Sequence, residues 1–272
     1  MDTINTRGAT RLYLNRIFVE EDEIRADSTV FLDADDYRFQ HIAKILKLEE
    51  GDVLRVGVVN VGMTDTARMI SCNKSNMTMS LGNPSTLAVA RKPSSVDMLL
   101  AVPRPLRLER LLPVVSCMGV NRLVLVDAAK VEKDYFGSHL FRRPAEVRKC
   151  FVEGLSQAES DYVLPEMLVR RRLKDFMENG ELDDLFPSQT HMRIIAHPDK
   201  ANRRISSLSP SLPTQTKVLL AIGPEGGWEN AEIDLFLANG FVPVTLGDRI
   251  LRTDMAVPAL IALAREWADV HS

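Results

Sequence analysis

The sequence predicts an α/β protein of two parts, a small β-rich domain followed by a mostly parallel sheet that helices cover. Its length of 272 residues is comfortable for two domains. Short strand-like segments dominate the first third of the chain, whereas strands and helices alternate from Val96 onward, which is typical of parallel sheets. We therefore expect a first domain over 1–88, a linker with proline and serine over 89–95, and a second domain over 96–272.

The composition is that of an ordinary globular protein, with 45% hydrophobic and 26% charged residues. No uncharged apolar run approaches the length of a membrane-spanning helix, so we expect no membrane contact. Cys72, Cys117 and Cys150 are widely spaced without a Cys-x-x-Cys pair, which favours reduced thiols over disulfides or a metal site. We expect a cytoplasmic protein without bound metal, although early arginines leave an organellar compartment open.

In the first domain, four apolar segments predict strands and a longer segment predicts a helix. The strands are expected at Leu12–Leu14, Thr29–Leu32, Val53–Val59 and Met77–Leu81, and the helix at Tyr37–Leu48. Short strands around one helix favour a small barrel. Arg38, His41 and Lys44 fall on or near one face of that helix, where they either meet phosphates or form a solvated surface.

Alternating segments in the second domain predict the parallel sheet and its helices. Strands are expected at Val96–Val102, Arg122–Val126, Met167–Arg170 and Met192–Ala196, and helices at Leu108–Met118 and Ala145–Ala158. The stretches 180–191 and 200–216 are rich in serine, proline and acidic residues, so they predict loops. The net charge of −3 argues against RNA binding by bulk electrostatics, so any RNA contact must use local basic patches.

A ligand site is predicted where the strand Val218–Ile222 leads into the glycine-rich turn 223–227. A helix then begins near Trp228, with acidic residues in its first turn, and stops at Gly240. Glycines let a backbone approach a ligand closely and present its amide groups. No Gly-Lys-Ser/Thr follows, so the turn is not a P-loop.

A second glycine turn, 247–249, follows the expected strand Val242–Leu246 and precedes a terminal helix whose N-cap would be Thr253 or Asp254. Open α/β sheets bind ligands at the carboxyl ends of their strands, where both turns lie. Glycine turns also make simple tight corners. Two nearby arginines favour a site, because two cations at a strand end are costly without an anionic partner.

The motifs IGPEGG (222–227) and LGDRILRTDMA (246–256) resemble the paired C-terminal signatures of the uridine-N3 methyltransferases of small-subunit ribosomal RNA, which belong to the SPOUT superfamily. Further blocks resemble that family in its usual order, namely Leu54–Gly57, Val102–Pro105, Ala129–Lys133, Gly154–Ala158 and Ala196–Pro198. The resemblance implies a PUA-like RNA-binding β-barrel, a SPOUT domain with a deep trefoil knot, S-adenosyl-L-methionine as cofactor and a homodimer. The implied reaction methylates N3 of a uridine in 16S-type rRNA, either free or in the assembled small subunit.

The resemblance also implies which residues bind the cofactor, largely through backbone groups. These residues are Ala196, His197, Ala221, Ile222, Gly223, Gly226, Gly227, Leu246, Gly247, Ile250, Leu251 and Arg252. For His197, a capping or core role is preferred over a catalytic one. The expected RNA contacts are Arg38, His41, Lys44, Arg104 and Arg107, and a solvated surface is the alternative explanation for each.

Loss of the proton from uracil N3 spreads negative charge over two carbonyl oxygens, which a guanidinium can stabilise. Arg252 is the first candidate for that role and Arg249 the second. Asp254 stands where the family has glutamate and is either a general base or a helix cap, and Glu225 is another candidate base. Met255 replaces a usual threonine, and a methionine cannot reproduce the hydrogen bond of a hydroxyl.

Two other functions stay open on the sequence alone. One is a non-catalytic RNA-binding or ribosome-assembly protein with the same fold, which would fail to bind the cofactor. The other is a knotted methyltransferase with another RNA target.

Overall fold

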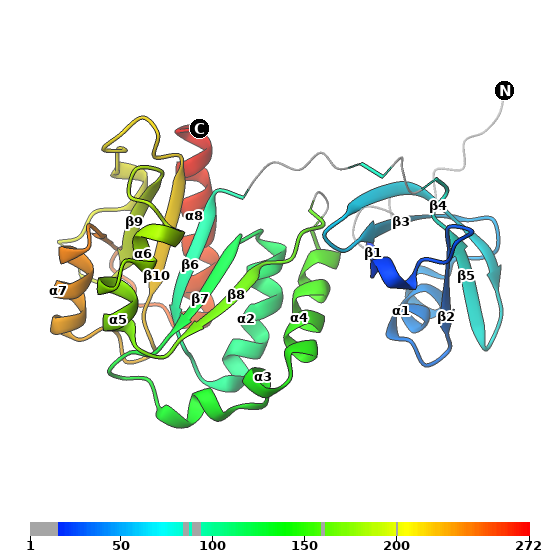
Figure 1. Ribbon diagram of the computed structural model, residues 1–272, viewed down its shortest axis with the longest axis horizontal. Helices are drawn as coiled ribbons and strands as arrows, with labels where there is room; N and C mark the ends of the chain where they lie inside the picture. The colour runs from blue at the N-terminus through cyan, green and yellow to red at the C-terminus, as the bar shows by residue number, and fades with distance from the viewer. Residues whose placement is uncertain (1–15, 84–86, 89–93, 159–160, 200) are drawn as a thin grey trace. The chain divides into compact units, whose positions relative to one another are not determined.

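A computed structural model describes residues 16–83, 87–88, 94–158, 161–199 and 201–272 (Figure 1). Contacts divide the chain into two compact units, the first containing Met1–Lys92 with Val152–Leu164 and the second containing Pro93–Phe151 with Pro165–Ser272. The strand expected at Leu12–Leu14 lies outside the described residues.

The first unit is built on a five-stranded sheet that curls into a half-barrel (Figure 1). Its strands are, in sheet order, β1 (Ile17–Val19), β3 (Val53–Val58), β4 (Gly62–Cys72), β5 (Asn76–Ser80) and β2 (Thr29–Asp33). β1 and β3 are parallel and the other pairs are antiparallel. Among the described residues the outer strands β1 and β2 do not pair, so the expected barrel is an open, curled sheet. Strands β2, β3 and β5 are confirmed within about one residue, whereas β1 and β4 were not predicted.

Alternation along the strands builds the core of this unit. Val30 and Leu32 on β2 are fully buried beside Met77 and Met79 on β5, with the intervening side chains partly exposed. Helix α1 (Tyr37–His41) covers the same core and continues as a π-helical turn over Ile42–Leu46. The helix expected through Leu48 ends earlier, because Lys47 takes a left-handed conformation with φ of 53°.

Residues 152–164 belong to the first unit, which the sequence did not predict. Val152, Leu155 and Tyr162 form an apolar cluster with Phe18 and Val59. The amide of Asn60 also donates to the carbonyl of Tyr162 at 2.7 Å. The expected second domain, 96–272, is therefore interrupted by a segment that completes the first unit.

The second unit is built on a six-stranded sheet in which every pair is parallel. In sheet order the strands are β11 (Val242–Val244), β9 (His191–Ala196), β10 (Lys217–Ile222), β6 (Val96–Ala101), β7 (Arg122–Val126) and β8 (Glu166–Arg170). The central strand β6 is buried along its whole length, because helices cover both faces of the sheet. All six strands confirm predicted segments, although β11 ends two residues earlier than expected.

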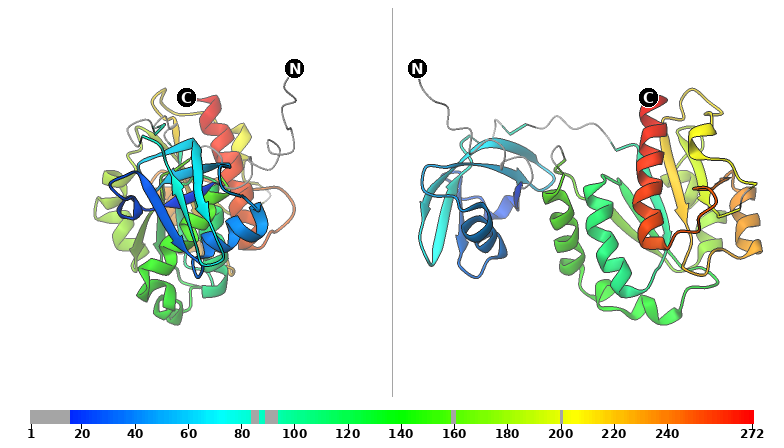
Figure 2. Two further views of the ribbon diagram at one scale, coloured as in Figure 1. Left: turned by 90° about the vertical axis from the view of Figure 1, so that its right-hand side faces the viewer. Right: turned by 180° about the vertical axis from the view of Figure 1, so that it is seen from behind.

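The helices of this unit form two groups, one on each face of the six-stranded sheet (Figures 1 and 2). They are α2 (Pro105–Cys117), α3 (His139–Arg142), α4 (Pro144–Ser156, of which 152–156 belong to the first unit), α5 (Leu173–Glu178), α6 (Glu181–Leu185), α7 (Asn230–Ala238) and α8 (Thr253–Val270). Helices α2 and α8 pack together, and α5 contacts α6 and α7. Among the described residues, no helix is both long and apolar enough to span a membrane.

Two local predictions in this unit were wrong. The stretch 180–191 is not entirely loop, because its acidic residues form the first turn of α6. Their negative charge is stabilised there by the positive end of the helix dipole. The N-cap of α8 is Arg252 rather than Thr253 or Asp254, and no side chain caps that end. The trefoil knot stays an expectation.

Candidate ligand site at the carboxyl ends of three strands

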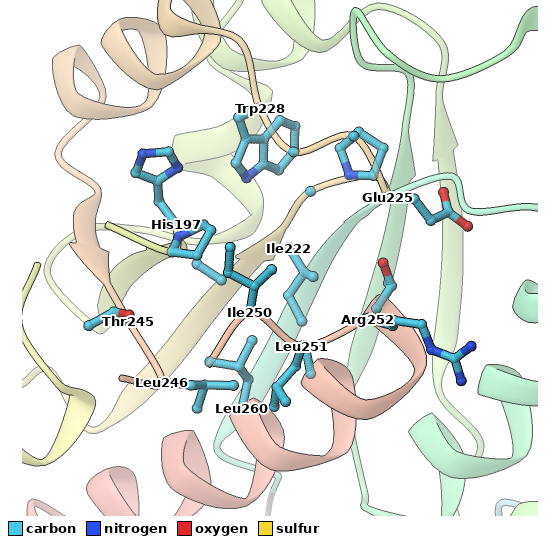
Figure 3. Close-up of a pocket in the computed structure, with 18 of the residues that line it drawn as sticks. His197, Ile222, Glu225, Trp228, Thr245, Leu246, Ile250, Leu251, Arg252 and Leu260 are labelled. Carbon is cyan, nitrogen blue, oxygen red and sulfur yellow. The ribbon is translucent and has the colours of Figure 1, made fainter. Parts of the chain in front are cut away.

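A cavity of about 590 Å³ lies at the carboxyl ends of β9, β10 and β11, which are neighbours in the parallel sheet (Figure 3). The three loops that follow these strands line it, and the start of α2 contributes as well. Its volume is in the range of pockets that bind a small ligand. The sequence predicted a pocket at these two glycine turns, and the structure places one there.

The first glycine turn leaves little room for a side chain at two of its glycines. A Cβ atom on Gly223 would lie 3.0 Å from Nε1 of Trp228, and one on Gly226 would lie 2.9 Å from Cδ of Lys130. Gly227 has φ of +70°, which favours glycine. The Lys130 ammonium also donates to the carbonyl of Gly226 at 3.1 Å, so the turn is held from the loop after β7.

The start of α7 fixes the far side of this turn. Glu229 and Glu232 form a capping box, in which Glu232 accepts a hydrogen bond from the amide of Glu229 at 2.8 Å. The other carboxylate oxygen of Glu232 accepts from the amide of Ala129 at 2.8 Å. One side chain therefore joins the helix to the loop that carries Lys130.

Glu225 is held by the start of α2. Arg107 donates to its carboxylate at 3.0 Å, and the amide of Arg104 lies 3.4 Å from the same oxygen. A hydrogen bond with Tyr135 and the nearby Glu225 carboxylate raise the pKa of Arg104. Arg104 and Arg107 therefore line the same cavity as the glycine turns, and Arg107 has a carboxylate partner there.

The second glycine turn is equally constrained. Gly247 has φ of +112°, and its missing side chain leaves room for the Arg204 guanidinium, whose Nη2 atom would be 3.0 Å from a Cβ. The amide of Gly247 donates to the Thr245 hydroxyl at 3.2 Å. These contacts set the course of the chain that brings Ile250 and Leu251 to the cavity wall.

Arg252 and Arg249 both line the cavity, in agreement with the prediction that they serve one site. The Arg252 side chain is 68% exposed and donates to Oδ2 of Asp254 at 3.2 Å. Asp254 is not among the lining residues that the structure describes, so its expected role as a base is not supported. Met255 is not among those lining residues either, and 57% of its surface is exposed.

Most of the predicted cofactor residues come together in this cavity. Those that line it are Ala196, His197, Ile222, Gly223, Gly226, Gly227, Leu246, Ile250, Leu251 and Arg252. Ala221 and Gly247 do not line it, because Ala221 is buried inside β10 and Gly247 packs against the Arg204 guanidinium. The sequence missed Trp228, Thr245 and Leu260, although the tryptophan directly after the glycine turn was a visible signal.

Two polar atoms on the cavity wall are buried without a hydrogen-bond partner among the described residues, Nδ1 of His197 and Nε1 of Trp228. The backbone of His197 is fixed, since its amide donates to the carbonyl of Val244 at 2.9 Å and its carbonyl accepts from Asn202 at 3.1 Å. Buried polar groups without partners are rare. Such atoms on a cavity wall favour a polar ligand.

In the first unit, the prediction that Arg38 contacts RNA is not supported. Its side chain is 12% exposed and forms ion pairs with Glu23 and Asp36. Burial alone would raise the pKa of both carboxyls, yet the hydrogen bonds from Arg38 bring both below their ordinary values. Arg38 is therefore used within the unit, whereas Lys44 is exposed and His41 half-exposed, as a contact residue requires.

Known proteins resemble the chain over most of its length. A 28% identical relative, "Ribosomal RNA small subunit methyltransferase E" of Treponema pallidum, aligns over 95% of this chain and 92% of its own. "Ribosomal RNA small subunit methyltransferase E 1" of Borreliella burgdorferi is 22% identical over 82% of this chain and 87% of its own.

Solved structures share the fold at 20% identity. The "Ribosomal RNA small subunit methyltransferase E from Neisseria gonorrhoeae bound to S-adenosyl methionine" covers 92% of this chain and 95% of its own with a TM-score of 0.66. A putative methyltransferase of Legionella pneumophila "in complex with the bound cofactor SAM" covers 93% and 98% with a TM-score of 0.67. Residues 90–265, which include every residue that lines the cavity, match the family described as the RNA methyltransferase domain. The chain belongs to this RNA methyltransferase family.

Proposed function

We propose that this protein uses S-adenosyl-L-methionine to methylate small-subunit (16S-type) ribosomal RNA, and that the methyl acceptor is N3 of a uridine. The observation that carries the proposal is the cavity itself, in which two glycine turns and two arginines meet at the carboxyl ends of adjacent parallel strands. The names of the relatives and the cofactor bound by two structural neighbours support the substrate and the methyl donor.

The residues present fit an adenosine-containing cofactor. Ile222, Leu246 and Leu260 give the cavity apolar walls for a flat base, and the glycine turns leave backbone groups accessible. Nδ1 of His197 and Nε1 of Trp228 supply hydrogen-bonding groups that have no partner among the described residues. When bound, S-adenosyl-L-methionine supplies a methyl group already activated on its sulfonium.

The protein's contribution to the reaction is then positioning and charge stabilisation. We assign Arg252 to the uracil oxygens, where negative charge develops as the N3 proton leaves, and Arg249 to a second contact with the nucleotide. Asp254 holds the Arg252 guanidinium from outside the cavity. Glu225 is paired with Arg107, so we assign it to positioning the glycine turn rather than to accepting the N3 proton. That proton then passes to solvent.

RNA recognition on the first unit is assigned to His41 and Lys44. With a net charge of −3, such local contacts must suffice, and an assembled small subunit offers a larger surface than free RNA. Ile250, 81% exposed, and the exposed Met255 are large apolar side chains near the start of α8, which supports a homodimer. The cytoplasm, or an organelle with its own ribosomes, would contain the substrate.

The test combines cofactor binding with methyl transfer. Purified protein should bind S-adenosyl-L-methionine in a calorimetric titration and transfer radiolabel from it to small ribosomal subunits or to 16S rRNA. Large-subunit RNA should accept no label. Binding without transfer to any RNA would favour the non-catalytic alternative, and transfer to a different RNA would favour a methyltransferase with another target.

A further inference from the structure

The two tryptophans of the chain differ in whether the indole N–H has a hydrogen-bond acceptor. Trp267 and Trp228 are both about 5% exposed or less, but Nε1 of Trp267 donates to the carbonyl of Leu208 at 2.9 Å. Nε1 of Trp228 has no partner among the described residues, and its side chain lines the cavity. A buried N–H normally finds an acceptor, so Trp228 is the exception that needs an explanation.

Packing holds the Trp228 ring in place. Its five-membered ring lies directly over Gly223, where a Cβ would be 3.0 Å from Nε1 and 3.2 Å from Cδ1. Phe236, which is fully buried, contacts the same ring edge-on with a centroid distance of 4.8 Å. The indole therefore cannot rotate toward another partner without displacing one of these neighbours, and the N–H is presented at the first glycine turn.

The surroundings of Trp228 point to one part of the ligand. Figure 3 shows the rings of Trp228 and His197 at one end of the cavity, with Glu225 and the Arg252 guanidinium at the other. An indole N–H can only donate, so its partner must be an acceptor. The sulfonium and ammonium groups of the cofactor are cationic and cannot accept, and its carboxylate is better neutralised by an arginine of the cavity such as Arg104 than by a neutral indole. Adenosine has ring nitrogens and ribose oxygens that accept.

We infer that the Trp228 indole N–H donates a hydrogen bond to the adenosine portion of the bound cofactor. The inference rests on the proposed function, because it needs S-adenosyl-L-methionine to be the ligand of this cavity. It adds a side-chain contact to a site otherwise made largely of backbone groups. It also explains why Gly223 carries no side chain, since a Cβ there would push the indole from its position.

The test is calorimetric, with the wild type and the variants Trp228→Phe and Trp267→Phe titrated with S-adenosylhomocysteine and with 5′-methylthioadenosine. Phenylalanine keeps an aromatic ring but removes the N–H. Trp228→Phe should weaken both ligands by about tenfold and to the same extent, because the bound acceptor loses its donor. Trp267→Phe should bind both ligands as the wild type does. Circular dichroism and the unfolding midpoint should show that both variants are folded.

Fluorescence gives a second measurement that does not depend on the Trp228→Phe variant. In Trp267→Phe the only remaining indole is Trp228, so saturation with S-adenosylhomocysteine should change its emission. Equal dissociation constants for wild type and Trp228→Phe would overturn the inference, as would an unchanged emission. A loss confined to S-adenosylhomocysteine would overturn it too, because the contact would then involve the amino-acid portion. Failure of the wild type to bind either ligand would instead overturn the proposed function.

Discussion

Gly223→Ala should destabilise the protein through a contact that the structure identifies atom by atom. The new Cβ would lie 3.0, 3.1 and 3.2 Å from three atoms of the Trp228 indole, closer than ordinary van der Waals contact. The ring has little room to retreat, since Phe236 packs against it at a centroid distance of 4.8 Å. Overpacking of this kind typically costs about 1–3 kcal/mol of unfolding free energy.

The backbone at Gly223 does not itself require glycine, because its φ is outside the left-handed region. The cost should therefore disappear when the indole is removed. In a Trp228→Leu background, Gly223→Ala should be neutral or stabilise by about 0.4–1 kcal/mol, since alanine reduces the entropy of the unfolded chain. Urea unfolding followed by circular dichroism measures all four proteins of this double-mutant cycle.

The cycle separates the packing explanation from a general intolerance of the turn. A coupling free energy of about 1–3 kcal/mol between the two positions is the expected result. If Gly223→Ala destabilises both backgrounds equally, the indole contact is not the cause, and the packing of Trp228 against Gly223 does not explain the intolerance of the turn.

Three further predictions concern charged groups. Arg252→Ala should reduce methyl transfer by at least about 100-fold while leaving the calorimetric affinity for S-adenosylhomocysteine within about threefold, because the guanidinium is assigned to the transition state; near-normal transfer would refute that role. Arg107→Glu should weaken cofactor binding, because the new carboxylate repels Glu225. The double variant Arg107→Glu/Glu225→Arg should recover most of the affinity. A double variant that binds no better than the single one would refute the positioning role of this pair. Arg38 lowers the folded-state pKa values of Glu23 and Asp36 below 4.5 and 3.8, so the two ionised carboxylates stabilise the folded protein above those pH values and lose this effect as the pH falls through the lowered pKa values. Urea unfolding from pH 6 to pH 3 should show a loss of unfolding free energy that is smaller in Arg38→Met than in the wild type. Parallel curves for the two proteins would contradict the linkage.

Sequence periodicity predicted the parallel sheet well, because its strands are buried on both faces and appear as short apolar runs. Strand β4 was not predicted, because its pairing with β5 shifts register between Met69 and Ser71 and its polar residues interrupt the apolar alternation. The return of residues 152–164 to the first unit depends on contacts far apart in sequence, which a local pattern does not contain.

The same distinction applies to the candidate site. The glycine turns were predictable because tight turns leave a local signature, and most residues assigned to them line the cavity. The pair between Arg107 and Glu225 was not predictable, because 118 positions separate its members. Arg38 was misread for a related reason. A basic residue on a helix face has the same pattern whether it meets RNA or, as here, carboxylates of its own unit.

The most direct test of the central claim is the chemical identity of the methylated nucleoside. Small ribosomal subunits that lack the modification should be incubated with the protein and S-adenosyl-L-methionine, and the rRNA digested and analysed by mass spectrometry against synthetic standards. We predict 3-methyluridine at a single position of the small-subunit rRNA, and none with Arg252→Ala. A different methylated nucleoside would contradict the assignment of uridine N3, and the absence of any new methyl group would contradict the proposed activity.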